Sequence, residues 1–259
     1  APVLTIDMVN PTPGTDGGHS LTVGGAVINW PATAPFTWTG NVSTNWSSAG
    51  NWSAGRAPNA TDSVIIPNIG NHPTLTADAA VGAVTVTGGT LSLGGHTLTT
   101  STGFYTTGTG ILNMINPTDS LQVSGAAVFD GGDETGHLTD GRLLVAGNLT
   151  QRHTTSLSSF LATGNHHVVL NGTGAQVLDF ADSISAFFAN LDDNNVSAVV
   201  QLSTAINVQG DFSMLPGSHL TGIDNSRTGT EFIVFGNISS PSTSTLTMGQ
   251  LLVGGTLSI

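Results

Sequence analysis

The sequence predicts an all-β fold, a right-handed parallel β-helix (β-solenoid), and three observations lead to it. Short hydrophobic runs alternate with polar residues, 34 of the 259 residues are glycine, and one seven-residue pattern keeps returning. The pattern is hydrophobic-x-hydrophobic-x-Gly-x-hydrophobic, and Leu143–Leu149 is its clearest copy. We call it the glycine pattern. A structural unit that recurs at a near-constant step is typical of stacked coils.

Copies of the glycine pattern recur along most of the chain. The complete copies centre on Gly125, Gly147, Gly210, Gly236 and Gly255. Weaker copies centre on Gly88, Gly108, Gly172 and Ala189, which takes the glycine position. We therefore expect coils of about 17–26 residues whose strands keep register while their loops vary. An antiparallel sandwich also has short strands with frequent turns, but it gives no reason for one pattern to return at one-coil spacing.

Within the pattern, a side-chain period of two places the hydrophobic residues and the glycine on the same face of a strand. The hydrophobic side chains can then stack on their equivalents in the coils above and below. A glycine at an inward position has no Cβ, so we expect the strand to bend there or the opposite wall to approach.

Three segments follow from this interpretation. Residues 1–37 contain strand-like runs but no glycine pattern, so we interpret them as an N-terminal extension. Residues 38–80 are rich in tryptophan and turn residues, and residues 81–259 carry the repeats. In the middle segment, Trp38, Trp46 and Trp52 could form a sugar-stacking surface. We favour a second interpretation, in which the indoles plug the open end of the β stack, because terminal repeats of solenoids need a cap.

A family resemblance rests on the same segment. Trp38-x-Gly40, two Asn-Trp-Ser triplets at Asn45 and Asn51, and Asp62-x-Val64-Ile65-Ile66 precede Gly- and Thr-rich β repeats. This run, residues 38–66, resembles the start of repetitive β-solenoid segments in secreted bacterial surface proteins, the autotransporter-like and filamentous-haemagglutinin-like adhesins. The resemblance implies adhesion or scaffolding at the cell surface. It transfers no individual functional residue, because the shared motifs are structural.

Composition narrows the function further. Only 8% of residues are charged, lysine is absent, and the formal net charge is −12. Such a surface repels phosphate, which disfavours nucleic acids and anionic membranes as partners. No apolar run is long enough to suggest membrane insertion. Cysteine is absent, which excludes disulfides and thiolate chemistry. Together with a start at Ala-Pro-Val, these features favour a mature extracellular or cell-surface protein of bacterial origin.

Candidate sites are few. The densest acidic stretch offers Asp130, Asp133 and Asp140 as Ca²⁺ ligands, but its spacing matches neither an EF-hand nor a β-roll repeat, so a solvated loop is favoured. The adjacent His166 and His167 should point to opposite faces of a strand and cannot share one ion.

Catalysis has equally little support in the sequence. Stacking could bring together the carboxyls of Asp179, Asp182 and Asp211, as a glycosidase would need, but nothing marks them as a pair. We assign no catalytic residue, expect no enzyme and expect no cofactor besides possible Ca²⁺.

The expected function is a rigid extracellular rod with a structural or adhesive role. The final copy of the pattern, with Leu251, Val253 and Leu257, would leave an open strand edge. Leu4, Ile6 and Met8 lie on an N-terminal strand that could cover this edge in a second copy of the chain, which predicts head-to-tail self-association into a filament or surface layer. The alternative is a carbohydrate-binding module or a polysaccharide-degrading β-helix enzyme. Eight Asn-x-Ser/Thr triplets also leave glycosylation open.

Overall fold

The computed structural model describes residues 20–23, 26–29, 35–222 and 231–258, and it divides into two compact units. The first unit, Ala1–Pro35, contains an antiparallel hairpin of β1 (Ser20–Val23) and β2 (Ala26–Asn29). The second unit, Phe36–Ile259, contains all other strands. The division falls two residues before the predicted end of the extension, because β3 (Phe36–Thr37) already pairs with β4 (Ser63–Ile66).

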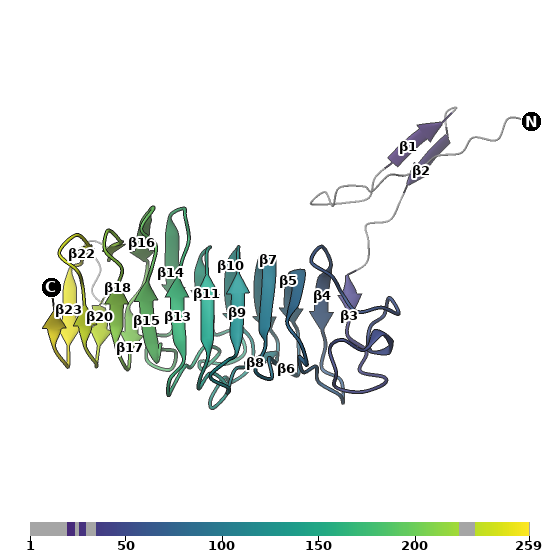
Figure 1. Ribbon diagram of the computed structural model, residues 1–259, viewed down its shortest axis with the longest axis horizontal. Coiled ribbons are helices and arrows are strands. Elements are labelled where there is room, and N and C mark those ends of the chain that lie inside the picture. The colour runs from purple at the N-terminus through teal and green to yellow at the C-terminus, as the bar shows by residue number, and fades with distance from the viewer. Residues whose placement is uncertain (1–19, 24–25, 30–34, 223–230, 259) are drawn as a thin grey trace, which may run out of the picture. The chain divides into compact units, whose positions relative to one another are not determined.

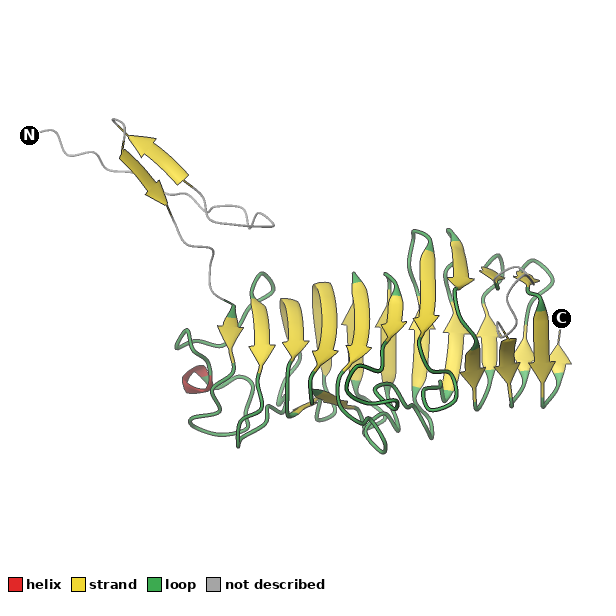
Figure 2. Ribbon diagram, turned by 180° about the vertical axis from the view of Figure 1, so that it is seen from behind, coloured by secondary structure: helices red, strands yellow, loops and turns green. Residues whose placement is uncertain are grey.

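The second unit is a parallel β-helix, as the sequence predicts. Its named strands pair only in parallel, and most of them pair with the equivalent strands in the coils on either side (Figure 1). Apart from one short 3₁₀ helix, η1 (Ala49–Asn51), the described residues are strands and loops (Figure 2). No described helix has the length and apolarity to cross a membrane. The right-handed sense of the coil stays a prediction.

Each coil has three sides, which we call wall 1, wall 2 and wall 3 in chain order. β5 (Ala79–Val86) and β7 (Thr97–Thr107) are long enough to run along wall 1 and bend into wall 2. Wall 1 continues through β9 (Ser120–Val123), β11 (Arg142–Val145), β13 (His167–Leu170), β15 (Asn190–Asp193), β18 (Phe212–Met214), β21 (Ile238–Ser239) and β24 (Leu257–Ser258).

Wall 2 starts with β3 and β4 and passes through the second halves of β5 and β7. It continues through β10 (Ala126–Asp130), β12 (Leu149–Gln151), β14 (Gln176–Phe180), β16 (Val199–Leu202), β19 (His219–Thr221) and β22 (Thr245–Thr247). Wall 3 is the least regular. It consists of β6 (Thr90–Ser92), β8 (Ile111–Asn113), β17 (Ile206–Val208), β20 (Glu231–Val234) and β23 (Gln250–Val253), with isolated bridges at Leu138, Ala162 and Phe187 between them.

Coil length varies along wall 1, as expected for loops of unequal length. The register places Phe212 opposite Ile238 and then Ile238 opposite Leu257, so a long coil is followed directly by a short one. The two shortest predicted steps, from Gly108 to Gly125 and from Gly172 to Ala189, are not whole coils, because no strand pairing joins equivalent positions across either step. Each step covers only two walls.

The short steps have a simple explanation, because the glycine pattern marks a different corner in each part of the solenoid. Gly88 and Gly108 lie between walls 2 and 3. The next three copies, at Gly125, Gly147 and Gly172, lie between walls 1 and 2. The last four copies, from Ala189 to Gly255, lie between walls 3 and 1. The position of the pattern within the coil thus changes twice along the chain. At each change, the distance between neighbouring copies spans two walls instead of three.

The reason for glycine also differs from the expectation. A Cβ added to Gly147 would lie 2.4 Å from the carbonyl oxygen of Gly125, and one added to Gly236 would lie 2.4 Å from that of Gly210. The Gly147 and Gly236 amides donate to these same carbonyls at 3.0 Å. The neighbouring coil, rather than the opposite wall, is what leaves no space for a side chain.

Inward-facing apolar side chains fill the coils and stack along the axis. A ladder of phenylalanines runs through the core, with neighbouring ring centroids 4.9 to 5.7 Å apart; it consists of Phe104, Phe129, Phe160, Phe180 and Phe188. A further edge-to-face pair, Phe212 with Phe232, lies in the later coils at 5.0 Å. Contacts of this kind contribute about 0.5–1.5 kcal/mol each beyond the burial of area.

Three tryptophans pack as an indole cluster at the start of the stack. Trp38, Trp46 and Trp52 are 1 to 3% exposed, and Trp52 packs edge-on against both others at centroid distances of 5.0 and 4.7 Å. The Trp52 Nε1 donates to the Trp46 carbonyl at 2.7 Å, and the Trp38 Nε1 donates to the Asn71 carbonyl at 2.6 Å. These buried faces cannot stack on a sugar, which removes that interpretation of the three indoles.

Candidate functional site

A polar cluster on the outside of wall 1 is a ladder built by four successive strands. Asp192 on β15 is its centre: its Oδ2 lies 3.0 Å from the Nδ1 of His167 on β13 and 3.8 Å from the Nη2 of Arg142 on β11. The Ser213 hydroxyl on β18 donates to the other Asp192 oxygen. We call these four residues the polar ladder. Its members project outward because the alternate residues of the same strands point into the core.

A pocket of about 340 Å³ lies at the corner between walls 3 and 1 of the same coils. Three coils contribute two lining residues each: Thr163 and Gly164, Phe187 and Ala189, and Gln209 and Gly210. His167, Asp192 and Ser213 follow Gly164, Ala189 and Gly210 by three positions. The pocket and the ladder are therefore separated by about 10 Å of strand, at about 3.3 Å per residue. We call this combined region the wall-1 patch.

The order of groups in the ladder limits its chemistry. A hydroxyl nucleophile of the Ser-His-Asp type needs the imidazole between the serine and the carboxylate, so that the imidazole can take the hydroxyl proton. Here the carboxylate of Asp192 lies in the centre, and Ser213 donates to it rather than to His167. The arrangement can donate and accept hydrogen bonds, but it does not activate the serine.

The three predicted Ca²⁺ ligands serve separate local roles. Asp130 accepts from the Thr154 amide at 2.9 Å, Asp133 accepts from the amide and hydroxyl of Thr135, and Asp140 accepts from the Gly141 amide. The hydroxyl and amide of Thr135 lower the pKa of Asp133. Across the part of the chain that the structure describes, no three His, Asp or Glu side chains form a group that could hold a metal ion. The acidic stretch is therefore not assembled into a cation site here.

Glu134, in the same stretch, turns into the protein instead of facing solvent. It is 0% exposed, and its Oε1 accepts from the Leu112 amide at 2.9 Å, where wall 3 has no regular strand to pair with β8. Burial raises the pKa of Glu134 well above its ordinary value. Its second oxygen bonds to no described residue. A buried, half-satisfied carboxyl fills a gap in the wall, which the sequence pattern did not indicate.

The two adjacent histidines point to opposite faces, as predicted. His166 is fully buried and both of its ring nitrogens have no hydrogen-bond partner among the described residues, whereas His167 belongs to the polar ladder. Burial lowers the pKa of His166 to about 3, helped by the neighbouring His167. The buried imidazole is therefore neutral at physiological pH.

The candidate carboxyls for glycosidase chemistry do not form a pair. Asp179 is held by Arg152 at 2.6 Å, Asp182 accepts from the amides of Ile184 and Ser185, and Asp211 accepts from the Asn237 amide. Each carboxylate is engaged in its own local contact.

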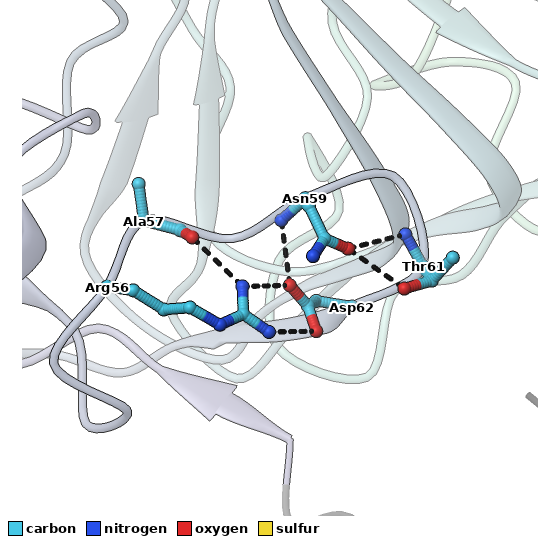
Figure 3. A network of polar contacts seen from close by, with 5 residues as sticks. All are labelled: Arg56, Ala57, Asn59, Thr61 and Asp62. Atoms are coloured by element: carbon cyan, nitrogen blue, oxygen red, sulfur yellow. Dashed lines mark hydrogen bonds and ion pairs between the residues drawn. The ribbon is translucent and has the colours of Figure 1, made fainter. Parts of the chain in front are cut away.

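Another ion pair stabilises the loop that leads into β4. The guanidinium of Arg56 makes two hydrogen bonds to Asp62, at 2.7 and 3.0 Å (Figure 3). The Arg56 Cζ also lies 4.2 Å from the Phe36 ring centroid. Burial alone would raise the pKa of Asp62, but the bonds from Arg56 and from the Asn59 amide lower it.

Two of the eight glycosylation triplets are closed by the fold. Asn51 and Asn195 are 0% exposed, and their amides donate to neighbouring groups, in Asn51 to the Asn45 carbonyl and in Asn195 to the Gly174 carbonyl. Asn41, Asn59, Asn148, Asn171 and Asn237 remain on the surface. Any glycan on the folded chain is therefore limited to the accessible triplets.

The sequence does not reveal the wall-1 patch, because aligning the copies of the glycine pattern ignores the changes of corner. Once the copies are aligned on the corner between walls 3 and 1, a polar residue follows three positions later in each coil of the patch, and this offset is the missed signal. The buried Asp119, Gln176 and Asn195 were also missed; they are single polar residues with no repeat of their own.

Comparison with known proteins gives one match. The model of a domain of unknown function (DUF8693) matches residues 37–139. The matched region begins in β3, includes the indole cluster and ends at the wall-3 bridge of Leu138, so it crosses the predicted boundary at residue 80. No curated protein and no solved structure matches the chain.

Proposed function

We propose that this chain is an extracellular structural or adhesive protein of bacterial origin, in which the β-solenoid acts as a rigid rod. The observation that carries the proposal is the parallel ladder that runs from β3 to β24 around a continuous apolar core. Main-chain ladders and apolar stacking depend little on charge, and only 8% of the residues are charged. We include in this proposal the role that the resemblance to autotransporter-like and filamentous-haemagglutinin-like adhesins implies, which is adhesion or scaffolding at the cell surface.

Self-association would extend the rod. Among the described residues, β22, β23 and β24 have a strand neighbour on one side only. Leu251 and Val253 there are half-buried, while Leu252 and Leu257 are 42% and 46% exposed. A two-stranded hairpin such as β1–β2 has little stability alone. We propose that residues 1–35 of a second copy cover this coil; the predicted contacts Leu4, Ile6 and Met8 lie outside the described residues.

Electron microscopy and analytical ultracentrifugation at high protein concentration test this proposal. We expect end-to-end oligomers of the full chain, and monomers after deletion of residues 1–30 or in Leu257→Asp. Asn171→Asp, a charge added on an exposed loop, is the matched control and should assemble normally. A full chain that stays monomeric, or a deletion variant that assembles equally well, would contradict the proposed assembly.

A further inference from the structure

The pocket of the wall-1 patch has a composition that selects among ligands. Gly164, Ala189 and Gly210 form the part of the lining that carries little or no side chain. The half-buried Phe187 supplies an aromatic ring, Thr163 a hydroxyl and the exposed Gln209 an amide. An aromatic face beside neutral hydrogen-bonding groups suits a molecule that has both an apolar face and polar edges.

The surroundings of the pocket favour a neutral ligand. No charged residue lines the pocket. On the neighbouring ladder, the Asp192 carboxylate is already bonded to His167 and Ser213 and lies near Arg142. The net charge of −12 opposes an anionic ligand, and no cation-binding group of side chains forms among the described residues.

The ladder adds hydrogen-bonding groups at a second point. Its imidazole, hydroxyl and carboxylate lie about 10 Å of strand from the pocket in the same three coils. Successive coils repeat at about 4.8 Å, so the patch presents an aromatic pocket and a row of polar groups to one extended ligand. A ligand with several hydroxyls could contact both, whereas a small apolar molecule would contact the pocket alone.

We infer that the wall-1 patch binds a neutral saccharide, with one sugar ring on Phe187, hydrogen bonds to Gln209 and Thr163, and the next sugar units along the polar ladder. The site lies away from the indole cluster that the sequence had suggested for sugar stacking. The inference deepens the adhesive part of the proposed function and rests on it, since it names the class of ligand that the rod would recognise.

The test is native affinity electrophoresis of the full chain in gels that contain xylan, mannan, starch or mixed-linkage β-glucan, with calorimetry on oligosaccharides of any polysaccharide that retards it. Phe187→Ala and Gln209→Ala should each raise Kd about tenfold or more. Tyr105→Ala and Gln201→Ala replace a half-buried aromatic and an exposed amide on wall 2, and they should change Kd less than about twofold.

Gln209 is exposed, so Gln209→Ala keeps the test valid if Phe187→Ala does not fold. A fifth gel contains anionic polygalacturonate. Retardation by none of the four neutral polysaccharides, retardation only in the polygalacturonate gel, or affinity unchanged in Gln209→Ala would overturn the inference. Failure of this inference can be told apart from failure of the proposed assembly by measuring the oligomeric state of the same variants in the ultracentrifuge. Phe187→Ala and Gln209→Ala should assemble like the wild type, because neither substitution lies in residues 1–35 or in β22–β24.

Discussion

The early coils and the later coils differ in which corners use stacked glycines and which use buried polar side chains. Between walls 1 and 2, the early coils stack glycine on glycine, with the Gly147 amide bonded to the Gly125 carbonyl, whereas the later coils use the buried amides of Gln176 and Asn195. Between walls 3 and 1 the order is reversed. Asp119 holds the early corner, and the stack of Gly210, Gly236 and Gly255 holds the later one.

The difference shows that the backbone groups at a corner can find hydrogen-bond partners in two ways. Where a strand turns, its backbone groups leave the regular ladder and need partners. Either the two coils approach until their backbones bond directly, which excludes a Cβ, or a buried polar side chain bridges the gap. The Asp119 carboxylate does so by accepting from the amides of Gly95, Ile115 and Asn116. The glycine pattern moves from corner to corner because the same corner can use stacked glycines in some coils and a buried polar side chain in others.

The largest expected effect comes from breaking the glycine corners. Gly147→Ala and Gly236→Ala each place a Cβ 2.4 Å from a carbonyl oxygen of the next coil, so we expect each to lower the free energy of unfolding by about 3 kcal/mol. Urea unfolding measures the loss. Gly174→Ala is the control, because its Cβ would meet nothing within 4 Å. Equal stability of the three variants would show that close approach is not why these glycines are needed.

Breaking the amide corner should cost slightly less. Gln176→Ala removes bonds to the Val145 and Gly147 carbonyls, to the Gly172 amide and to Asn195, so buried polar groups lose their partners. We expect a loss of about 2 to 3 kcal/mol in urea unfolding. The exposed Gln201→Ala should change the free energy of unfolding by less than about 0.5 kcal/mol. If the two variants lose the same amount, the network does not support the corner.

Two titratable side chains are buried next to corners, His166 directly before β13 and Asp193 at the end of β15. His166 has a pKa of about 3 in the fold, against about 6.5 when unfolded, so the unfolded chain gains a proton first as the pH falls. Stability from this residue is complete above pH 6.5 and is lost toward pH 3, with a loss of about 2 kcal/mol by pH 5. Urea unfolding of His166→Met should show a weaker acid dependence than the wild type.

The last expected effect has the opposite sign. Asp193, buried at the end of β15, has its pKa raised by burial to about 6. The folded state therefore holds its proton longer than the unfolded state, and stability from this group, present below about pH 3.8, is lost as the pH rises through 6. Asp193→Asn should be about 2 kcal/mol more stable than the wild type at pH 8 and no more stable at pH 4. An equal change at both pH values would contradict the buried charge as its cause.

The sequence predicts the fold class well because a solenoid repeats its signal. Each copy of the pattern marks a strand, a corner and a strand, and all the copies agree. The opposite orientations of His166 and His167 follow from the same period of two. What the pattern cannot contain is the corner at which each copy lies, because that depends on which strands pair. The steps from Gly108 to Gly125 and from Gly172 to Ala189 therefore looked like short coils.

The candidate site was harder to predict for the same reason. Phe187, Gln209 and Asp192 come from separate walls or coils, and only the correct register brings them together. Asp130, Asp133 and Asp140 lie close in the sequence, yet the chain turns between them and uses each carboxylate locally. In this fold, two residues that are one coil apart in the sequence are more often close in space than two residues that are a few positions apart.

The two moves of the glycine pattern also determine how such a rod can be lengthened by design. A coil copied from within one stretch, such as residues 125–146, would end at the same corner at which it began and could be inserted in register. A copy taken across a move, such as residues 108–124, would begin at one corner and end at another, and the downstream chain would be rotated by one wall.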